Sequence, residues 1–542
     1  MKKIYFTICL MLMAASGFAQ APNWVWAKSA GGASAEYGQG TAADAVGNIY
    51  LVGAFQSSPL IFGTNTLTNN GDFDVFITKY DAAGNVLWAH SAGGSAMDYG
   101  YGIATDHAGN VYITGWFNST TITFGAFTLT NAGTGPDIFL VKYDSTGNVV
   151  WAKRAGGTAG DTGYSVATDA DCNVYVTGEF QSTAITFGAT TLTNAGGLVP
   201  NDIFIAKYDS AGNALWAKRA GGTGSDYGNS VAVDNHGNAY LTGNFCSSSI
   251  TFGSTTLTNN GSGNIYLTKF DSTGAVLWAK SAGGSSSDGG NSVAIDNNGN
   301  PCIAGLFSSS TLTIGTTVLT NAGGDDVFVA KYDTLGNPLW ANSIGGSLND
   351  QTFSLTTDNL GHVYLSGAFQ SPSITIGITT LTNAGNYDVF VAKYSPSGNA
   401  LWAKSAGDSG YDYAYSICSD ISGNIYVSGY FSSTSIIMDA FTLTNAGGSD
   451  LFIGRLGSGV SIDEMDVSEN NLMIFPNPAN GLLTIVTSKK SEVEFLNIHG
   501  QVVKSIMSDG TTTIDISGLA SGMYFVKTRM ENGIMVKKFI KR

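Results

Sequence analysis

The chain has 542 residues, of which 71 are glycine, 10 are proline and 12% are charged. This length accommodates several ordinary domains, or one large repeat domain with a small companion. Abundant glycine, low charge and the lack of long helical periodicity exclude a mainly helical protein and favour many short strands joined by tight turns.

Charge divides the chain into two parts. Residues 20–456 contain 14 Lys and Arg against 31 Asp and Glu, a net charge of −17, whereas residues 471–542 contain 9 against 5, a net charge of +4. The acidic balance of the larger part argues against a nucleic-acid partner. The change of sign predicts two domains, joined by the polar, acidic residues 457–470, which we interpret as a linker.

Residues 1–19 have the pattern of a secretory signal peptide. Two lysines precede the apolar run 4–15, and Gly17-Phe18-Ala19 is a small-x-small cleavage site. The alternative is a membrane anchor, but the run is shorter than the roughly 20 residues that span a bilayer. We therefore expect an exported protein without a membrane span.

Four cysteines follow, and they occupy different positions in different repeats: Cys172, Cys246, Cys302 and Cys418. A disulfide framework would place cysteines systematically. We predict free, mostly buried thiols, with a Cys246–Cys302 bridge as the one pairing to test. No Cys/His spacing indicates a zinc site.

A strand of the pattern Trp-Ala-[Lys/His/Asn] recurs at intervals of 62 to 65 residues, at Trp26, Trp88, Trp151, Trp216, Trp278, Trp340 and Trp402. The first copy has no apolar strand before it, whereas the last apolar strand, residues 450–455, has no tryptophan strand after it. A circular repeat protein closes in this way, with its first strand completing its last blade. A β-solenoid is the alternative architecture, but it would not explain why one repeat is divided between the two ends of the repeat region.

Residues 98–151 show one repeat unit. Strands are expected at 98–106, 111–117, 138–143 and 149–154. The third of these is apolar on both faces, so both faces must be covered, as happens when blades stack around a ring. Seven copies of each strand predict an all-β protein with a seven-bladed β-propeller of four-stranded blades over residues 20–456.

Turns of the form Asp-x-x-Gly-Asn connect the strands, and a Thr- and Asn-rich insert such as 122–131 follows the second strand in six repeats. The aspartate accepts hydrogen bonds from the backbone that follows it, and the glycine takes a left-handed conformation. Calcium ligation is the alternative, but no EF-hand-like run is present. We expect the insert to form an extra hairpin on one face of the disc.

The core Asp-x-x-Gly-Asn-x-Tyr-[Val/Leu/Ile]-x-Gly, at residues 106–115 and 420–429, resembles the bacterial SBBP-type β-propeller repeat. Other repeats depart from it, since Cys172 replaces the Gly, His362 the Asn and Cys302 the Tyr. The resemblance covers about 430 residues. It implies the propeller fold and says little about function.

Residues 471–542 contain short apolar strands separated by turns, which predict a small β-sandwich. Phe475-Pro476-Asn477-Pro478, Gly522, Tyr524 and the basic pair Lys537-Lys538 resemble the type A C-terminal sorting domain of type IX secretion. That resemblance implies recognition by the type IX secretion machinery and delivery to the medium or to the outer surface of a Gram-negative bacterium.

One carboxylate recurs eight residues before the aspartate that closes each first strand: Glu36, Asp98, Asp161, Asp226, Asp288, Asp350 and Asp412. If these strands line the axis, seven carboxylates ring one mouth and favour a bound cation, for which Ca²⁺ is the candidate. The alternative is that each carboxylate caps backbone N–H groups where the chain enters its blade. The residue after it varies: Tyr37, Tyr99, Thr162, Tyr227, Gly289, Gln351 and Tyr413.

We predict no catalytic residue and no other cofactor. Residues 407–410, Gly-Asp-Ser-Gly, resemble a serine-protease nucleophile loop, but they occupy a turn and no histidine or aspartate is placed to complete a triad. Trp116 departs from the repeat and is a candidate exposed contact. We expect a monomeric, non-catalytic protein that binds an extracellular glycan or protein. A carbohydrate-active enzyme and a purely structural protein are the alternatives.

Overall fold

The computed structural model describes residues 21–197, 200–457, 472–475, 479–487, 490–497, 500–530 and 533–542. The expected signal peptide, linker residues 458–470 and Pro476-Asn477-Pro478 of the sorting motif lie outside these ranges. The described residues form strands and turns, and none of them belongs to a helix that could cross a membrane. They divide into two compact units, Met1–Gly459 and Val460–Arg542.

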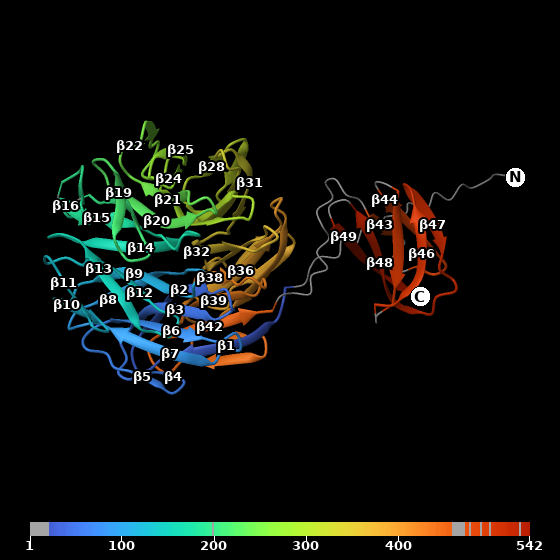
Figure 1. Ribbon diagram of the computed structural model, residues 1–542, viewed down its shortest axis with the longest axis horizontal. Helices are drawn as coiled ribbons and strands as arrows, with labels where there is room; N and C mark the ends of the chain where they lie inside the picture. Colours follow the sequence, from blue (N-terminus) through green and yellow to red (C-terminus); the bar gives the residue numbers. More distant parts are fainter. Residues whose placement is uncertain are drawn as a thin grey trace. The chain divides into compact units, whose positions relative to one another are not determined.

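Four-stranded antiparallel sheets repeat through the first unit, which confirms the all-β repeat fold (Figure 1). Among the described residues from Trp24 to Leu456 there are seven such sheets, numbered here as blades 1 to 7. From first to fourth strand, they are β2 (Glu36–Ala43), β3 (Ile49–Phe55), β6 (Asp74–Tyr80) and β7 (Val86–Ala92); β8 (Asp98–Thr105), β9 (Val111–Phe117), β12 (Asp137–Tyr143) and β13 (Val149–Ala155); β14 (Asp161–Thr168), β15 (Val174–Phe180), β18 (Asp202–Tyr208) and β19 (Ala214–Ala220); β20 (Asp226–Val233), β21 (Ala239–Phe245), β24 (Asn264–Phe270) and β25 (Val276–Ala282); β26 (Asp288–Ile295), β27 (Pro301–Phe307), β30 (Asp326–Tyr332) and β31 (Pro338–Ile344); β32 (Asp350–Thr357), β33 (Val363–Phe369), β36 (Asp388–Tyr394) and β37 (Ala400–Ala406); and β38 (Asp412–Ser419), β39 (Ile425–Phe431), β42 (Asp450–Leu456) and β1 (Trp24–Ala30).

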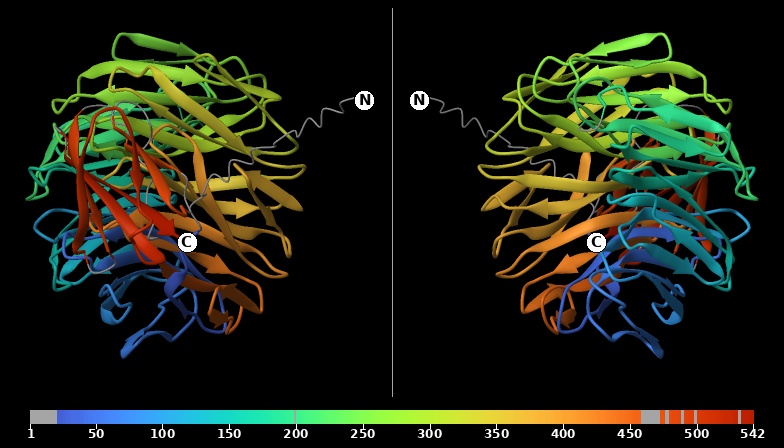
Figure 2. Two further views of the ribbon diagram at one scale, coloured as in Figure 1. Left: turned by 90° about the vertical axis from the view of Figure 1, so that its right-hand side faces the viewer. Right: turned by 90° about the vertical axis from the view of Figure 1, so that its left-hand side faces the viewer.

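The blades form a closed ring. First strands of neighbouring blades contact one another all the way round, including β38 against β2, so they lie at the centre. Third strands such as β12 are buried along their whole length, as expected for sheets covered on both faces. Blade 7 is completed by β1, which pairs antiparallel with β42 and places Ala27 opposite Gly454. The orphan first strand therefore completes the last blade, and Figure 2 shows the stacked sheets from two sides.

A two-stranded hairpin follows the second strand of every blade, which confirms the inserted hairpin. Blade 1 also has one, although the insert pattern did not include it. The hairpins are β4 (Leu60–Phe62) with β5 (Asn65–Leu67), β10 (Thr121–Phe124) with β11 (Phe127–Thr130), β16 (Ala184–Phe187) with β17 (Thr190–Thr193), β22 (Ser249–Phe252) with β23 (Thr255–Thr258), β28 (Thr311–Ile314) with β29 (Thr317–Thr320), β34 (Ser373–Ile376) with β35 (Thr379–Thr382), and β40 (Ser435–Met438) with β41 (Phe441–Thr444).

The hairpins lie at the circumference and not on one face of the disc, so the predicted position was wrong. Strand β11 contacts the fourth strand of its own blade, and β10 contacts the fourth strand of the preceding one. Ile122 and Phe124 of β10 are buried in the core shared by blades 1 and 2. Each hairpin therefore covers the outer edge of a blade interface.

The Asp-x-x-Gly-Asn turns have the predicted structural role. Asp44 Oδ1 accepts hydrogen bonds from the backbone N–H groups of Val46 (3.0 Å) and Asn48 (2.9 Å), and Gly47 has a φ of +86°. In blade 3 the glycine position is Cys172, which has a φ of +59°. A side chain there adds strain that glycine avoids.

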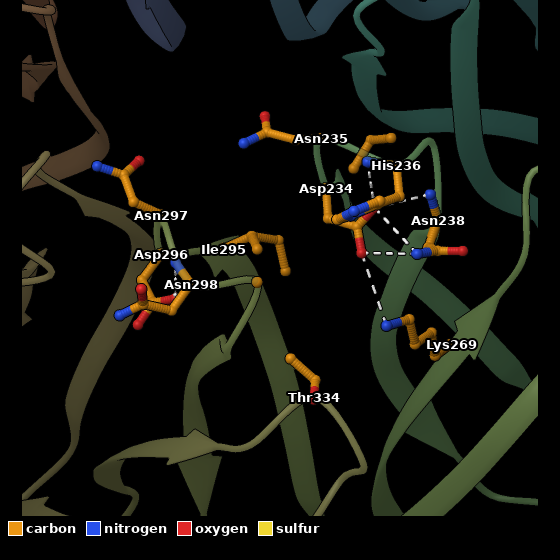
Figure 3. Close-up of a pocket in the computed structure, with 12 residues that line it drawn as sticks. Asp234, Asn235, His236, Asn238, Lys269, Ile295, Asp296, Asn297, Asn298 and Thr334 are labelled. Atoms are coloured by element: carbon orange, nitrogen blue, oxygen red, sulfur yellow. Dashed lines mark hydrogen bonds and ion pairs between the residues drawn. The ribbon is translucent and has the colours of Figure 1, made fainter.

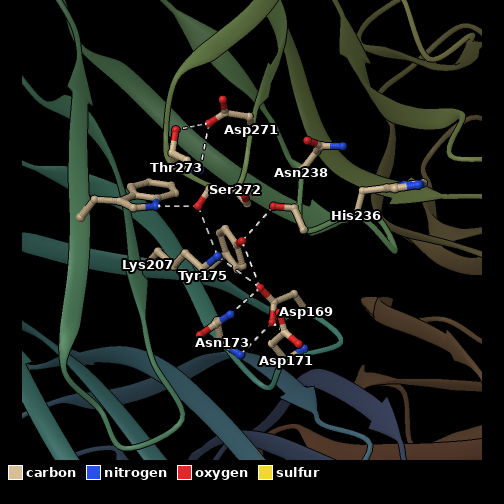
Figure 4. Close-up of polar contacts among 12 residues, drawn as sticks. Asp169, Asp171, Asn173, Tyr175, Lys207, His236, Asn238, Asp271, Ser272 and Thr273 are labelled. Carbon is tan, nitrogen blue, oxygen red and sulfur yellow. Dashed lines mark hydrogen bonds and ion pairs between the residues drawn. The ribbon is translucent and has the colours of Figure 1, made fainter.

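Side chains of one blade hold the backbone of the next (Figure 4). In blade 3, the Tyr175 hydroxyl donates to the Gly237 carbonyl of blade 4 (2.9 Å). The Lys207 ammonium (3.3 Å) and the Trp216 indole N–H (3.1 Å) both donate to the Ser272 carbonyl, also in blade 4. These bonds explain why Tyr, Lys and Trp recur at fixed repeat positions.

The ring closes through a variant of this contact. In blade 7 an arginine, Arg455, stands where blades 1 to 6 have lysine, and the tryptophan is Trp26 of the N-terminal strand. Both donate to the Ala82 carbonyl of blade 1, at 3.0 Å and 3.1 Å. The two ends of the repeat region are therefore fastened to the same peptide group.

The second unit consists of two antiparallel sheets, as expected for a β-sandwich. One contains β43 (Leu472–Phe475), β44 (Leu482–Thr487) and β47 (Thr511–Asp515), and the other β46 (Val502–Ser508), β45 (Ser491–Leu496), β48 (Gly522–Met530) and β49 (Gly533–Lys541). Tyr524 stacks on Phe539 at 5.5 Å between centroids. Lys537 and Lys538 lie in β49, opposite Val526 and Phe525 of β48.

All four cysteines of the described residues are free, as predicted. The Cys246–Cys302 bridge is not formed, since Cys302 is buried in its blade whereas Cys246 is exposed. The expectation of mostly buried thiols was wrong, because Cys302 is buried whereas Cys172 and Cys418 are partly exposed and Cys246 is exposed.

We expect Trp26→Ala to lower the free energy of unfolding by about 3–5 kcal/mol, because it removes a buried indole and one of the closing hydrogen bonds. Val25→Ala is the matched control, since Val25 lies next to it on β1 but is 48% exposed. Urea unfolding of the full chain measures both. Equal destabilisation by the two changes would contradict the closing role of Trp26.

We expect Cys172→Gly to stabilise the chain by about 1 kcal/mol, because it relieves the left-handed strain. Gly109→Cys, the same turn position in blade 2, should destabilise it by a similar amount. Thermal melting of both variants checks the opposite signs, and a loss of stability in Cys172→Gly would show that the thiol contributes packing.

Candidate ligand-binding site

The seven recurring carboxylates are buried at the start of the first strands. Asp98 shows their contacts: Oδ2 accepts from the Gly94 N–H (2.9 Å) and the Ser119 hydroxyl (2.7 Å), and Oδ1 accepts from the Asn118 N–H (3.0 Å). Backbone N–H groups reach both oxygens of each of the other six as well. These are the contacts of the capping alternative.

The structure holds each of these carboxylates in its own blade and does not gather them around one cation. Among the described residues no group of three or more His, Cys, Asp or Glu side chains is arranged to hold a metal ion. Calcium binding by this set stays a prediction, which a calorimetric calcium titration tests.

A second set of buried carboxylates begins the third strands, and the sequence reading did not identify it. Its members are Asp74, Asp137, Asp202, Asp326, Asp388 and Asp450, with Asn264 in blade 4. Burial and, to a smaller extent, the Asp98 carboxylate of the next blade raise the pKa of Asp74 to about 6. Each blade interface therefore brings a capping carboxylate close to a second one.

The surroundings of this second carboxylate differ between blades in three ways. Arg154 and Arg219 pair with it in blades 2 and 3. Blade 4 has the neutral Asn264. The remaining four have no arginine, and burial together with the neighbouring blade's carboxylate raises the pKa of each to about 6, as for Asp326 beside Asp350. Four interfaces thus hold an aspartate that is partly protonated near pH 6.

A cavity of about 330 Å³ lies between the turns of blades 4 and 5 (Figure 3). Two of its polar side chains pair with each other, since Lys269 lies 3.6 Å from the Asp234 carboxylate, and Asp234 Oδ1 also accepts from the backbone N–H of His236 at 2.9 Å. The cavity is lined by turn and interface residues of the repeat. We therefore assign it to the structure of the interface.

The repeat symmetry fails at the ring centre. Three positions differ from blade to blade: the residue after the capping carboxylate, the one two places further on, and the second-strand residue paired with the first of these. In blades 1 to 7 they are Tyr37, Gln39 and Ala54; Tyr99, Tyr101 and Trp116; Thr162, Tyr164 and Glu179; Tyr227, Asn229 and Asn244; Gly289, Asn291 and Leu306; Gln351, Phe353 and Ala368; and Tyr413, Tyr415 and Tyr430.

Aromatic side chains from blades 6, 7, 1, 2 and 3 form one connected cluster, here called the aromatic arc. Its members are Phe353, Tyr413, Tyr415, Tyr430, Tyr37, Phe73, Tyr99, Trp116, Tyr101 and Tyr164. Tyr430 lies 4.9 Å from Tyr37 across an interface, and Tyr99 stacks on Trp116 at 5.1 Å between centroids. Burial, with smaller contributions from Tyr37 and Tyr101, raises the pKa of Tyr415 to about 12.

Glu179 is the one acidic residue at these three positions. The Tyr164 hydroxyl donates to one carboxylate oxygen and the Asn201 amide to the other, both at 2.8 Å. Burial raises the pKa of Glu179, and these two hydrogen bonds offset part of the rise. The aromatic arc therefore ends beside a partly buried carboxylate.

Sequence reasoning found part of this site. Trp116 was identified because it broke the repeat, and it packs within the arc. The varying residue after each capping carboxylate was the signal for the tyrosines. Glu179 was missed because its position in the second strand is unremarkable until the register of β14 and β15 places it opposite Thr162.

We expect Asp326→Asn to raise the free energy of unfolding by about 3 kcal/mol at pH 7.5 and by about half as much at pH 5, since one pKa unit corresponds to about 1.4 kcal/mol. A carboxyl whose pKa is raised in the folded state stabilises below its unfolded pKa and loses that contribution as the pH rises through about 6.

Asp202→Asn is the contrast, because it leaves Arg219 without its carboxylate and should destabilise the chain at both pH values. Urea unfolding at pH 5 and 7.5 measures both variants. If the wild type had a higher free energy of unfolding than Asp326→Asn at pH 7.5, the prediction would be contradicted, because the charged carboxylate would then be stabilised in the folded state.

Comparison with protein families gives two matches. The secretion system C-terminal sorting domain matches residues 473–542. The β-propeller repeat family matches residues 88–120 and 215–244. The sorting domain indicates recognition by the secretion machinery, and secretion or cell-surface attachment of the protein.

Two curated relatives are similar over most of the chain. An uncharacterized WD repeat-containing protein of Acanthamoeba polyphaga mimivirus is 25% identical over 80% of this chain and 38% of its own length. Regulatory protein FlaEY of Caulobacter vibrioides is 26% identical over 62% of this chain and 36% of its own length. The chain thus spans less than two fifths of these relatives.

Solved structures match only loosely. The extracellular domain of BT4673 from B. thetaiotaomicron matches 96% of this chain and 100% of its own, with 11% identity and a TM-score of 0.16. A puromycin hydrolase matches 74% and 59%, with 10% identity and a TM-score of 0.29. The fold and the two family matches agree: the first unit carries β-propeller repeats, and residues 473–542 match a secretion system C-terminal sorting domain, which indicates secretion or cell-surface attachment.

Proposed function

We propose that this protein is a non-catalytic extracellular binding protein that takes a glycan at the centre of its ring. The observation that carries the proposal is the aromatic arc, where the repeat symmetry fails. Elsewhere the blades repeat their contacts, so variation at the centre indicates a function that the scaffold does not require.

The arc has the chemistry of a sugar-binding surface. Its tyrosines and Trp116 combine large apolar faces with polar ends, and most are only partly buried. Asn229, Asn244 and Asn291 supply amide groups on the other side of the ring centre. Aromatic walls with a few polar groups are typical of small-molecule sites, and sugar rings offer apolar faces and hydroxyls that match both.

The same positions argue against hydrolysis. Glycosidases use two carboxyl groups that flank the scissile bond, at about 5–10 Å from each other. At the three variable positions Glu179 stands alone, and the buried carboxylates nearby are engaged as caps or lie at blade interfaces. A carbohydrate-active enzyme is the second reading, and product analysis after incubation with bound glycans tests it.

We expect Tyr99→Ala and Trp116→Ala to weaken glycan binding at least tenfold, because each removes a stacking face. Phe127→Ala is the control, since Phe127 is an equally half-buried aromatic residue on the circumferential hairpin β10–β11. Binding of the full chain to a glycan array, followed by calorimetry on the best oligosaccharide, measures the effect.

Unchanged binding by Tyr99→Ala and Trp116→Ala would contradict the proposed site. If Phe127→Ala weakened binding instead, the Thr-rich hairpins would be the contact surface. Release of shorter oligosaccharides by the wild type would contradict the non-catalytic role.

A further inference from the structure

We infer that the ring centre selects a glycan that carries a protonated amino group, with Glu179 as the counter-ion of that group. The inference rests on the proposed glycan-binding function and names its ligand class. The required chemistry is an amino sugar with a free amine, such as glucosamine.

Glu179 is unusual within its own repeat position. The strand register places Glu179 opposite Thr162. At the equivalent positions, blade 1 pairs Tyr37 with Ala54 and blade 5 pairs Gly289 with Leu306. The other six residues at its position are Ala54, Trp116, Asn244, Leu306, Ala368 and Tyr430, none of them charged. The ring scaffold therefore forms six times without a carboxylate at this place.

Among the described residues, the hydrogen bonds to the Glu179 carboxylate come from neutral groups. Tyr164 and Asn201 donate one hydrogen bond each. Among the described residues no lysine, arginine or histidine forms an ion pair with it, although Asp137 and Asp202 in the second set each have an arginine. A partly buried carboxylate without a cation is costly, as its raised pKa shows. An ammonium group of a ligand would supply the missing positive charge beside the Glu179 carboxylate.

The aromatic rings beside Glu179 also favour a ligand that carries an ammonium group. Tyr101 and Tyr164 lie 5.7 Å apart between centroids and are tilted by 55°, so they present two faces at one end of the arc. The Tyr164 hydroxyl donates to Glu179, and the Glu179 charge contributes to raising the pKa values of Tyr101, Tyr164 and Tyr227. Aromatic faces attract ammonium groups, and more strongly where water is excluded.

Aromatic and polar residues lie on different sides of the ring centre. Blades 7, 1 and 2 present mainly aromatic faces, whereas Glu179 of blade 3 is followed by Asn229 and Asn244 of blade 4. An oligosaccharide that stacks on the arc would direct one end toward the carboxylate. Recognition of the amine then adds to stacking and does not replace it.

A pair of probes tests the inference: a glucosamine hexamer and the N-acetylglucosamine hexamer, which differ in the charge of the amino group. Calorimetry with the full chain at pH 6 should show at least tenfold tighter binding of the glucosamine hexamer. Glu179→Gln should reduce this preference to about twofold or less, with little change for the acetylated hexamer. Asp72→Asn is the control, because the Asp72 carboxylate bonds to Gln56 and should leave the preference unchanged.

The outcomes separate the two proposals. Equal affinity for both hexamers would overturn the inference and leave the glycan function intact. Binding of tetramethylammonium that needs Glu179, without binding of either hexamer, would support the cation site and overturn the glycan function. A preference that persists in Glu179→Gln, with the thermal melting temperature unchanged, would assign charge selection to other carboxylates and overturn the role of Glu179.

Discussion

The hydrogen bonds that cross each blade interface are the constraint on which the rest of the structure depends. A four-stranded sheet that is apolar on both faces cannot stand alone, so every blade needs a neighbour on each side. Tryptophan and lysine side chains help to meet this need by binding a backbone carbonyl of the next blade, as Lys142 and Trp151 bind the Ser210 carbonyl. At the closure, Arg455 and Trp26 share the Ala82 carbonyl, which joins the last blade and the N-terminal strand to the first blade.

The same interfaces carry an electrostatic cost. The close packing of Gly93 against Asp74 leaves Asp74 Oδ1 buried without a hydrogen-bond partner among the described residues. Arg154 and Arg219 offset the charge of Asp137 and Asp202 through the other carboxylate oxygen, and Asn264 carries no charge, although Oδ1 has no hydrogen-bond partner among the described residues in these three blades either. Because the capping oxygens of Asp98 and its equivalents are saturated by donors, they fix where the chain enters each blade and are poorly placed to share a cation.

The fold could be predicted further than the site, for a physical reason. Contacts made in every repeat leave a periodic signal, so the spacing of Trp26 and its equivalents revealed the blades and the closing strand. Whether a recurring insert lies on a face or at the circumference depends on what Ile122 and Phe124 pack against, and that is tertiary information. The paired carboxylates escaped notice because Asp74 and Asp98 belong to different blades and meet only when the ring closes.

Function in a ring of similar blades has to reside where the repeats differ, because identical contacts are already explained by packing. The repeated tyrosine, lysine and tryptophan contacts recur because they bind a neighbouring blade, whereas the residues at the three ring-centre positions change from blade to blade. Tyr99, Trp116 and Glu179 occupy these variable positions. Their chemistry is specific nonetheless: stacked aromatic faces end beside one carboxylate, that of Glu179, which has no cationic partner within the described parts of the chain. A scaffold without a ligand has no use for that arrangement, so it favours binding over a purely structural role.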